Sequence, residues 1–417
     1  MRGFLSSGVI AMLSLQAMVS GCVFRGVRRD IAVVQRSASI RGTVTRDGAG
    51  RGDILVVVYT PGASVAADVF TLGAPGQYLF TLPAGDYRVM AFEDANGDRV
   101  FEPGSELRSE VTQIQVAEGE NRGDVDLHLS PNSGTAFDLP RLPPPGQRAV
   151  PGLPDIQVGT ITTLDDPRFS ADNGRFGMWE PIAFMFNVGA GIYFLEPCDK
   201  SRTPILFVHG IGGNPTDFKY LVSRLDRDRF QPWFVYYPSG LELSRTADGI
   251  ARWMRELQAR CGFRRLVVVA HSMGGLVARA FIERAAGGVV PAIGGIDTFI
   301  SISTPWGGHR AAARGVERAP AVVPAWRDLA PGSPFLETLM GTPLPRDLHY
   351  YLFFGFAGSN RSPLLTGAND GVVTVAAELD PSAQKAAIRM FGYDETHTGI
   401  LNSSAVAAQL NALLEVP

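Results

Sequence analysis

Apolar positions along the chain follow two different patterns, one on each side of a proline-rich stretch. From residue 37 to residue 130, short apolar or alternating runs of strand length are separated by Gly, Pro and Asp turns, and no helical period appears. We expect six strands here, at Ile40–Thr45, Asp53–Tyr59, Gln77–Leu82, Asp86–Phe92, Val111–Val116 and Asp124–Leu129. Residues 37–130 are therefore predicted to form a small all-β sandwich domain.

After residue 155, short apolar strands alternate with helical patterns. Helices are predicted over Asp217–Leu225 and Thr246–Cys261. The expected strands are Ile205–Val208, Trp233–Tyr237, Leu266–Ala270, Phe299–Ser303, Tyr351–Phe356 and Ile388–Phe391. This alternation predicts an α/β domain over residues 155–417, with a mostly parallel sheet between two layers of helices. Residues 131–154 are dense in Pro and Gly and predict an extended linker between the two domains.

The run Leu266–Ala270 leads directly into His271, Ser272 and Met273, which two glycines follow. Apolar residues at helical spacing come next, at Leu276, Val277, Ala280 and Phe281. A strand, a sharp turn with serine at its apex and a helix form a nucleophile elbow, in which the residues around the serine must be small. Ala270 stands where this motif usually has glycine, and it is small enough to fit. We therefore expect Ser272 to act as a nucleophile.

A second glycine-rich loop follows the predicted strand Ile205–Val208. Its residues His209–Gly210–Ile211–Gly212–Gly213 let backbone N–H groups approach a substrate oxygen without obstruction by side chains. We expect an oxyanion hole made by the N–H groups of Ile211 and of Met273, the residue after the nucleophile. His209 and His271 are expected to have structural roles.

Five segments together resemble the bacterial lipase and esterase branch of the α/β-hydrolases: Val208–Gly213, Ala270–Gly275, Ser303–Gly308, Asn369–Val373 and His397–Ser403. The resemblance covers about residues 155–417. It implies the α/β-hydrolase fold and a triad in the chain order Ser, Asp or Glu, His. That branch includes sequences related to deacylases of lipid-anchored glycans, so the resemblance does not fix the substrate.

The implied order restricts the base to a histidine downstream of Ser272. His309 lies in a loop just past a strand, with little room for an acid before it, and His349 opens a strand. His397 follows the last predicted strand and precedes the final helix, where the base of this fold belongs. We therefore expect His397 to be the general base.

The acid of the triad should follow the penultimate strand. Asp370 fits, because Gly371 allows a tight turn that points the carboxylate toward the strand ends. Asp380 and Asp394 are alternatives, and an ordinary Asp-Gly turn is the structural alternative for Asp370 itself. In the leading interpretation Asp370 orients His397 and stabilises its protonated form.

The N-terminus has the features of an export signal. Met1–Arg2 is positive, Phe4–Val19 is apolar but short for a membrane span, and Val19–Cys22 resembles a bacterial lipobox. The resemblance implies a signal peptide over residues 1–22 and lipidation of Cys22, with an ordinary signal peptide as the alternative. Val23 is not the Asp that retains such lipoproteins at the inner membrane. We therefore expect a cell-envelope protein, anchored in the outer membrane of a cell that has one.

Cys198 and Cys261 each lie a short distance before a predicted strand. In the α/β-hydrolase topology these two strands are parallel neighbours, so both cysteines should reach the same edge of the sheet. A disulfide is predicted, since exported proteins keep such bonds, and two separate buried thiols are the alternative.

The β region resembles small transthyretin-like or carboxypeptidase-regulatory-like domains, through the segment Pro83–Val89. Within it, Asp94, Asn96 and Asp98 resemble the start of a Ca²⁺ loop. The twelfth position is Ser105 and the sixth is Arg99, which does not match an EF-hand. A solvated hairpin loop is the favoured interpretation, and structural Ca²⁺ the weaker one.

Charge and motifs exclude other functions. Lys and Arg number 38 and Asp and Glu 41, without a basic run, so nucleic-acid binding is not expected. The chain shows no metal-ligand spacing or dinucleotide loop, and we expect no cofactor. Residues 311–348 are rich in Ala, Pro and Gly and predict either a cap over an acyl pocket or a connecting helix pair.

The sequence thus predicts a lipid-anchored serine hydrolase that cleaves carboxylic, lipid-like esters through an acyl-enzyme. An acyltransferase or amidase with the same triad is one alternative, and a non-catalytic envelope scaffold is another. The sequence leaves the acyl chain length and the oligomeric state open.

Overall fold

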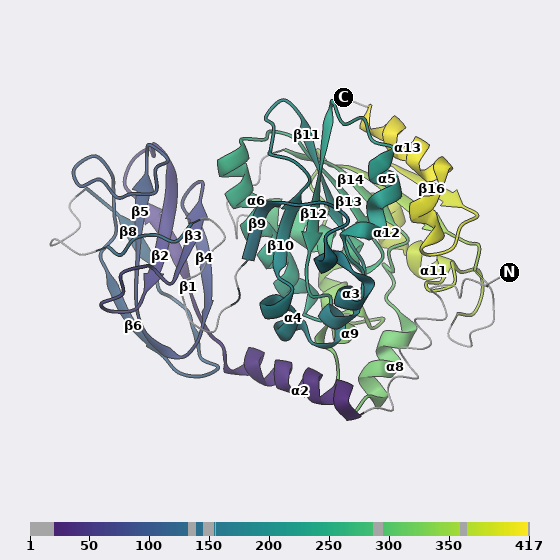
Figure 1. Cartoon of the computed structure of the whole chain (residues 1–417), viewed down its shortest axis with the longest axis horizontal. Helices are drawn as coiled ribbons and strands as arrows, with labels where there is room; N and C mark the ends of the chain where they lie inside the picture. The colour runs from purple at the N-terminus through teal and green to yellow at the C-terminus, as the bar shows by residue number, and fades with distance from the viewer. Residues whose placement is uncertain are drawn as a thin grey trace.

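A computed structural model describes residues 21–131, 139–144, 154, 156–286, 295–358 and 365–415. An N-terminal β region lies beside a larger α/β region (Figure 1). The first 20 residues of the signal peptide predicted over residues 1–22, and most of the predicted linker, lie outside the described residues. The predicted domain boundaries stay predictions.

The described part of the β region contains two four-stranded sheets. In one, β1 (Ala38–Arg46) pairs with β4 (Gly76–Leu82), β7 (Asn121–Arg122) and β8 (Leu127–Leu129). The other has the order β3 (Asp68–Leu72), β2 (Asp53–Tyr59), β5 (Gly85–Asp94), β6 (Thr112–Val116). One buried cluster takes side chains from both sheets, among them Ile40 and Val56. The likeness to transthyretin-like sandwiches stays a prediction.

Among the described residues, the α/β region has an eight-stranded sheet in the order β16-β15-β14-β13-β11-β12-β10-β9. The six strands from β11 to β16 are parallel, whereas β10 is antiparallel to β12 and β9 is parallel to β10. Their bounds are β9 Ile156–Ile161, β10 Ala190–Phe194, β11 Thr203–Val208, β12 Phe230–Tyr236, β13 Leu266–His271, β14 Ile296–Ile302, β15 His349–Gly355 and β16 Arg389–Tyr393. The mostly parallel sheet predicted from sequence is confirmed.

Both faces of this sheet are buried, because successive residues of a strand point to opposite sides. Along β11, Leu206 and Val208 join the core beneath α6 (Leu243–Cys261) and α7 (Met273–Ala286). Ile205 and Phe207 join the core beneath α5 (Lys219–Ser223) and α13 (Ser404–Leu414). This two-sided burial explains why the strands are continuous apolar runs.

The remaining helices are short and lie mostly between strands. The predicted helix Asp217–Leu225 is in fact a 3₁₀ turn, η3 (Pro215–Phe218), followed by α5. Residues 311–348 contain most of α8 and all of α9 and α10. The other bounds are η2 Pro167–Phe169, α3 Ala171–Trp179, α4 Pro181–Asn187, α8 Arg310–Arg318, α9 Pro324–Leu329, α10 Pro334–Gly341, α11 Val375–Glu378, α12 Pro381–Ala386 and η4 Gly399–Asn402. Within the described ranges, no helix has the length and apolar character needed to cross a membrane.

The N-terminal helix α2 (Gly21–Arg36) was not predicted, and it packs on the α/β region (Figure 1). Asp30 Oδ2 accepts hydrogen bonds from the N–H groups of Ile182 and Ala183, at 2.7 and 3.2 Å, and so caps the start of α4. Val27 is buried. The segment that follows the predicted lipidation site is therefore docked on the α/β region.

An ion pair and a disulfide fix the outer parts of the fold. Arg252 of α6 binds Asp68 of β3 through two hydrogen bonds, at 2.5 and 3.1 Å, which ties the two regions together. Cys198 and Cys261 form the predicted disulfide, with Cα atoms 6.0 Å apart. It joins the segment after β10 to the end of α6.

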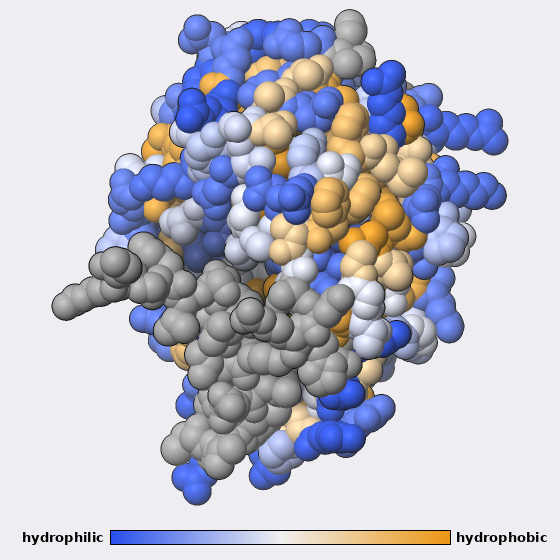
Figure 2. All heavy atoms as spheres, turned by 90° about the vertical axis from the view of Figure 1, so that its right-hand side faces the viewer, coloured by the Kyte–Doolittle hydropathy of each residue, from blue (hydrophilic) through white to orange (hydrophobic). Residues whose placement is uncertain are grey.

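The face of the molecule that carries β16 and α13 displays a broad apolar area (Figure 2). Ile388, which precedes the edge strand β16, and Met390, which lies in that strand, are about half exposed. The same strand ends close to the predicted base, His397, so the sheet edge and the candidate site share one end of the molecule.

Candidate active site

Ser272 occupies the apex of the turn between β13 and α7. Its φ is 55°, a conformation that is uncommon for residues other than glycine, and its N–H donates to the carbonyl of Ile302 at 2.8 Å. A Cβ on Gly274 would lie 2.4 Å from the carbonyl oxygens of Val208 and His209, and so only glycine fits there. The turn therefore has the strained, closely packed form predicted for a nucleophile elbow.

The structure brings Ser272, His397 and Asp370 together at the carboxyl ends of the parallel strands. His397 Nε2 lies 2.9 Å from Ser272 Oγ, and His397 Nδ1 lies 2.5 Å from Asp370 Oδ2. All three side chains are buried. Ser272 follows β13, Asp370 lies in the turn after β15 and His397 follows β16, so the sheet topology places them at one edge.

The two oxygens of Asp370 have different partners. Oδ1 accepts the N–H groups of Val372 and Val373 at 2.9 and 2.7 Å, whereas Oδ2 faces His397. Burial acts to raise the pKa of Asp370, but the His397 imidazole and these hydrogen bonds outweigh it and lower the pKa overall. Asp370 is therefore an ionised acceptor held in a fixed orientation. Of the alternative acids, Asp380 caps α12 and Asp394 is exposed.

Two further histidines lie within hydrogen-bond distance of backbone carbonyl groups in and beside the triad. His271 Nε2 lies 2.8 Å from the carbonyl oxygen of His397, and His309 Nε2 lies 2.9 Å from that of Val372. Burial lowers the pKa of His309, and burial together with the charge of His397 lowers the pKa of His271 to about 3. Both rings are therefore neutral near pH 7, and each can donate a hydrogen bond that positions a neighbour of the triad.

The glycine-rich loop after β11 lies against the elbow. A Cβ on Gly210 would lie 2.8 Å from Ser272 Cβ, so this glycine is needed for the close approach. The N–H of Gly212 donates to Ser239 Oγ at 2.8 Å and that of Gly213 to the carbonyl of Gly210 at 3.1 Å. These two N–H groups are occupied. The N–H groups of Ile211 and of Met273, at the start of α7, stay the predicted donors of the oxyanion hole.

His209 has the structural role expected for it. Its Nδ1 lies 2.8 Å from the carbonyl of Gly210, and its ring stacks on Tyr237 with centroids 4.3 Å apart. The Tyr237 hydroxyl donates to the His209 carbonyl at 2.7 Å. Burial lowers the pKa of His209 to about 4, so the ring is a neutral support of the oxyanion loop.

Sequence reasoning missed Glu378, a fully buried acid in the segment after the Asp370 turn. Burial, together with the charge of Asp370, raises its pKa to about 10. No sequence motif includes Glu378. Helix α11 has only one turn, which is too short to show a helical pattern, and the Asp-Gly turn motif before it ends at residue 371.

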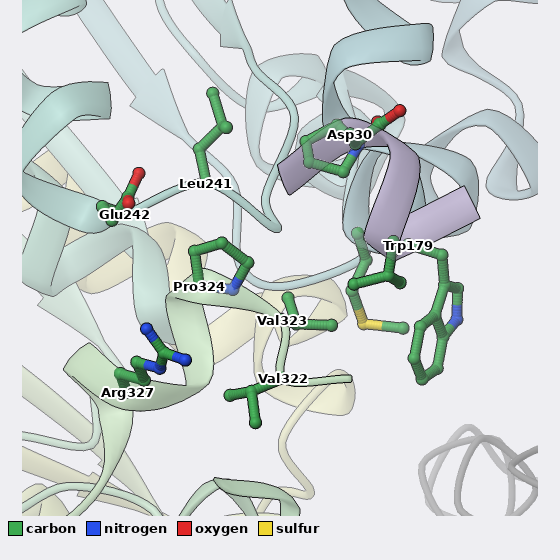
Figure 3. Close-up of a pocket in the computed structure, with 11 residues that line it drawn as sticks. Asp30, Trp179, Leu241, Glu242, Val322, Val323, Pro324 and Arg327 are labelled. Atoms are coloured by element: carbon green, nitrogen blue, oxygen red, sulfur yellow. The ribbon is translucent and has the colours of Figure 1, made fainter. Parts of the chain in front are cut away.

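A separate cavity of about 120 Å³ lies between α2 and the α/β region (Figure 3). Its walls are mostly apolar, with Trp179, Leu241 and Val323 among them, and Asp30, Glu242 and Arg327 add charges. None of the three triad residues lines it. Ser239 accepts a hydrogen bond from the N–H of Gly212 in the oxyanion loop. Leu241 lies two residues further along the chain, so the segment that lines the cavity also supports this loop.

The predicted calcium residues take part in a local turn. Asp94 accepts the N–H groups of Gly97 and Arg99 at 3.0 and 3.2 Å, and Asn96 accepts the N–H of Asp98 at 3.0 Å. Across the described ranges, no group of three or more His, Cys, Asp or Glu side chains is arranged to hold a metal ion. The loop has the hydrogen bonds of the favoured hairpin interpretation, and Ca²⁺ binding stays a prediction.

In the comparison with protein-family models, residues 200–329 match the family described as "Putative serine esterase (DUF676)". The matched segment includes the oxyanion loop and Ser272 and ends before Asp370 and His397. No curated protein matches the chain.

Solved structures similar to this chain include three from bacteria. Lipase BlEst2 of Bacillus licheniformis in mature form is 19% identical, with 52% of this chain and 94% of the lipase covered and a TM-score of 0.40. The lin2722 gene product of Listeria innocua is 18% identical, with 52% and 95% covered and a TM-score of 0.39. Phospholipase PlaB of Legionella pneumophila, in complex with thio-NAD, is 18% identical, with 42% and 44% covered and a TM-score of 0.33. The family match, which spans the segment around Ser272, supports ester hydrolysis.

Proposed function

We propose that this protein is a lipid-anchored serine hydrolase that cleaves carboxylic esters of lipid-like substrates through an acyl-enzyme. The observation that carries the proposal is the continuous pair of hydrogen bonds from Ser272 through His397 to Asp370. A serine hydroxyl alone is a poor nucleophile, and an adjacent base oriented by a third group activates it.

In the first half of the reaction, Ser272 Oγ attacks the acyl carbon while His397 Nε2 takes its proton. Asp370 holds His397 with Nδ1–H toward the carboxylate and stabilises the imidazolium that forms. The N–H groups of Ile211 and Met273 stabilise the oxyanion, and each such donor contributes about 3 kcal/mol to transition-state binding. His397 then gives its proton to the leaving alkoxide, which departs as the alcohol.

In the second half, a water molecule attacks the acyl-enzyme. His397 accepts a proton from this water, the second oxyanion collapses, and the acid product leaves as Ser272 regains its proton. An alcohol in place of water would make the same site an acyltransferase, and an amide substrate would make it an amidase. The supporting family match is to an esterase, which favours water and an ester.

The first test is hydrolysis of p-nitrophenyl esters with acyl chains of two to sixteen carbons, by wild type and by Ser272→Ala. We expect wild-type turnover with a preferred chain length and a loss of at least about 10⁴-fold in kcat/KM for the variant. Alcohol acceptors and p-nitroanilide amides, added in parallel, separate the acyltransferase and amidase alternatives. Wild-type protein without turnover on any of these substrates would favour the non-catalytic scaffold.

The anchor belongs to the same proposal. Cys22 of the predicted lipobox lies in the first turn of α2, and α2 docks on α4 through Asp30. Lipid attached at Cys22 would place the α/β region beside the membrane that holds its ester substrate, since acyl chains bind bilayers by about 0.8 kcal/mol per buried CH₂. The wild-type protein should fractionate with the envelope membrane, and its N-terminal peptide should carry the added mass of acyl chains. The Cys22→Ser variant should lack this added mass and should not fractionate with the membrane. If Cys22 of the wild-type protein carries no lipid, the proposed lipid anchor is wrong, and the proposed ester hydrolysis is not affected.

A further inference from the structure

Glu378 ends the one-turn helix α11, which is fixed against the elements of the candidate site. The N–H of Val375 donates to the carbonyl of Ala368 at 2.8 Å, and the carbonyl of Ala377 accepts the N–H of Gly307 at 2.9 Å. Thr374 caps the helix through its hydroxyl. Glu378 is completely buried, so its carboxyl is held in place by the same turn that carries Asp370.

The carboxyl of Glu378 faces polar groups of the site and no cation. Helix α11 packs on β15, and a Cβ on Gly355, the last residue of β15, would lie 3.2 Å from Asp370 Cβ, so Glu378 and Asp370 meet at this end of the strand. Ser303, the backbone of Gly355 and Asp370 influence the protonation of Glu378. Among the described residues, no N–H or O–H group donates to either carboxyl oxygen in good hydrogen-bond geometry, and none of the ion pairs involves Glu378. A buried carboxylate without a cation or donors is costly, so the environment favours a neutral acid that carries its own proton.

Asp370 offers a place for that proton. A carboxylate accepts about four hydrogen bonds, and Asp370 receives three, from Val372, Val373 and His397. Two buried carboxyls in contact do not both ionise, and one proton is shared so that one group is the acid and the other the base. The pKa of Asp370 is lowered, whereas that of Glu378 is raised to about 10.

We propose that Glu378 is a positioning residue, whose protonated carboxyl donates a hydrogen bond to Asp370 and keeps it ionised and oriented toward His397. This inference rests on the proposed function, because Asp370 matters only if His397 is the base. The titratable groups that surround the pair are His397, His271 and His309, and burial lowers the pKa of the latter two. Around neutral pH, the proton on Glu378 and the charge on Asp370 therefore set the field at His397.

The test uses the full chain and two variants, Glu378→Gln and Glu378→Leu. Glutamine keeps a donor and no charge, whereas leucine has about the same size and no donor. For each protein we would measure kcat and KM on the best p-nitrophenyl ester between pH 5 and 9, and Tm. A role in packing alone would change Tm and leave the pH profile unchanged.

We expect Glu378→Gln to stay within about threefold of wild-type kcat, with the same acidic limb in the pH dependence of kcat/KM. For Glu378→Leu we expect a loss of about 10- to 100-fold in kcat, with little change in KM. Its acidic limb should move to higher pH by about half a unit to one unit, because Asp370 without the donor binds the imidazolium more tightly.

Two results would overturn the inference. If Glu378 is ionised in the native protein, Glu378→Gln removes a negative charge, and its acidic limb moves to lower pH. If Glu378→Leu keeps the wild-type profile, the residue only fills space. Should Glu378→Leu fail to fold, the Glu378→Gln profile still decides between a neutral and an ionised acid. Wild-type protein without esterase activity would instead contradict the proposed function.

Discussion

Two turns in this chain contain an aspartate that accepts backbone N–H groups, but the two carboxylates differ in their remaining partners. In the loop of the β region, Asp94 gives Oδ1 to the N–H of Gly97 and Oδ2 to the N–H of Arg99. In the α/β region, Asp370 gives only Oδ1 to its own turn and presents Oδ2 to His397. When both carboxylate oxygens bind the backbone of the turn, the aspartate only stabilises that turn. When one buried carboxylate oxygen makes no hydrogen bond within the turn, it can accept a hydrogen bond from a histidine and orient that base.

The strongest test of this contrast is Asp370→Asn against its matched control Asp94→Asn. Asparagine at residue 370 keeps an oxygen for the turn but offers N–H₂ to His397, which favours the wrong tautomer. We expect a loss of about 10⁴-fold in kcat, with Tm close to wild type. Asp94→Asn should leave ester hydrolysis within twofold, because its loop does not reach the site. If Asp370→Asn stays within tenfold of wild type, the contrast between the two turns fails.

Each turn also contains a glycine with positive φ, which gives a second matched pair. Gly371 has φ 99° and Gly97 has φ 78°. A Cβ would meet nothing within 4 Å at Gly97 and would lie 4.0 Å from the Cα of Gly358 at Gly371, so neither position lacks space. Alanine at either position costs about 1–2 kcal/mol of backbone strain. Gly371→Ala should also lower kcat by about tenfold or more, because a relaxed turn moves Asp370 away from His397. Gly97→Ala should lower only Tm, and a comparable loss of kcat there would break the comparison.

A smaller effect concerns stability alone. Asp94→Ala removes two hydrogen bonds to backbone N–H groups, each with a net value of about 1 kcal/mol. We expect the free energy of unfolding to fall by about 2 kcal/mol in denaturant titrations, without a change in kcat. Millimolar Ca²⁺ should leave the Tm of wild type unchanged, since both Asp94 oxygens are already occupied. A Ca²⁺-dependent rise in Tm that is lost in Asp94→Ala would instead establish a calcium site.

The smallest expected effect is a pH dependence of stability. The pKa of Asp370 is lowered in the folded protein, so its ionised form contributes stability above the unfolded value of 3.8, and this contribution is lost as the pH falls through the folded pKa. Relative to Asp370→Asn, wild type should therefore lose free energy of unfolding on acidification below about pH 4. Parallel unfolding curves at pH 3 and pH 6 would show it. A difference between the two proteins that does not change with pH would contradict the lowered pKa.

Much of the fold was predictable because burial and periodicity are local signals. The six parallel strands were all expected, since strands buried on both faces appear as continuous apolar runs. In the described part of the chain, β9 and β10 of the α/β region and β3 and β7 of the β region were missed. Helix α2 was missed because residues near a lipobox are read as a processing signal, although Asp30 caps α4 across about 150 residues. Such long-range caps have no local pattern.

The residues of the candidate site divide in the same way. Ser272, Asp370 and His397 lie in glycine-containing turns after strands, so their positions in the chain restricted them strongly. The hydrogen bonds of His271 and His309 to carbonyl oxygens depend on tertiary contacts over 126 and 63 residues. Glu378 carries no sequence signal, because its burial beside Asp370 results from the packing of a one-turn helix.

The most direct measurement is covalent labelling of the intact protein with a fluorophosphonate probe, with the modified peptide identified by mass spectrometry. Only a serine activated by a neighbouring base reacts rapidly with such a probe. Stoichiometric labelling of Ser272, absent in Ser272→Ala and slowed by at least about 10³-fold in His397→Ala, is the result expected. Wild-type protein that stays unmodified, or that is labelled equally fast without His397, would contradict the central claim.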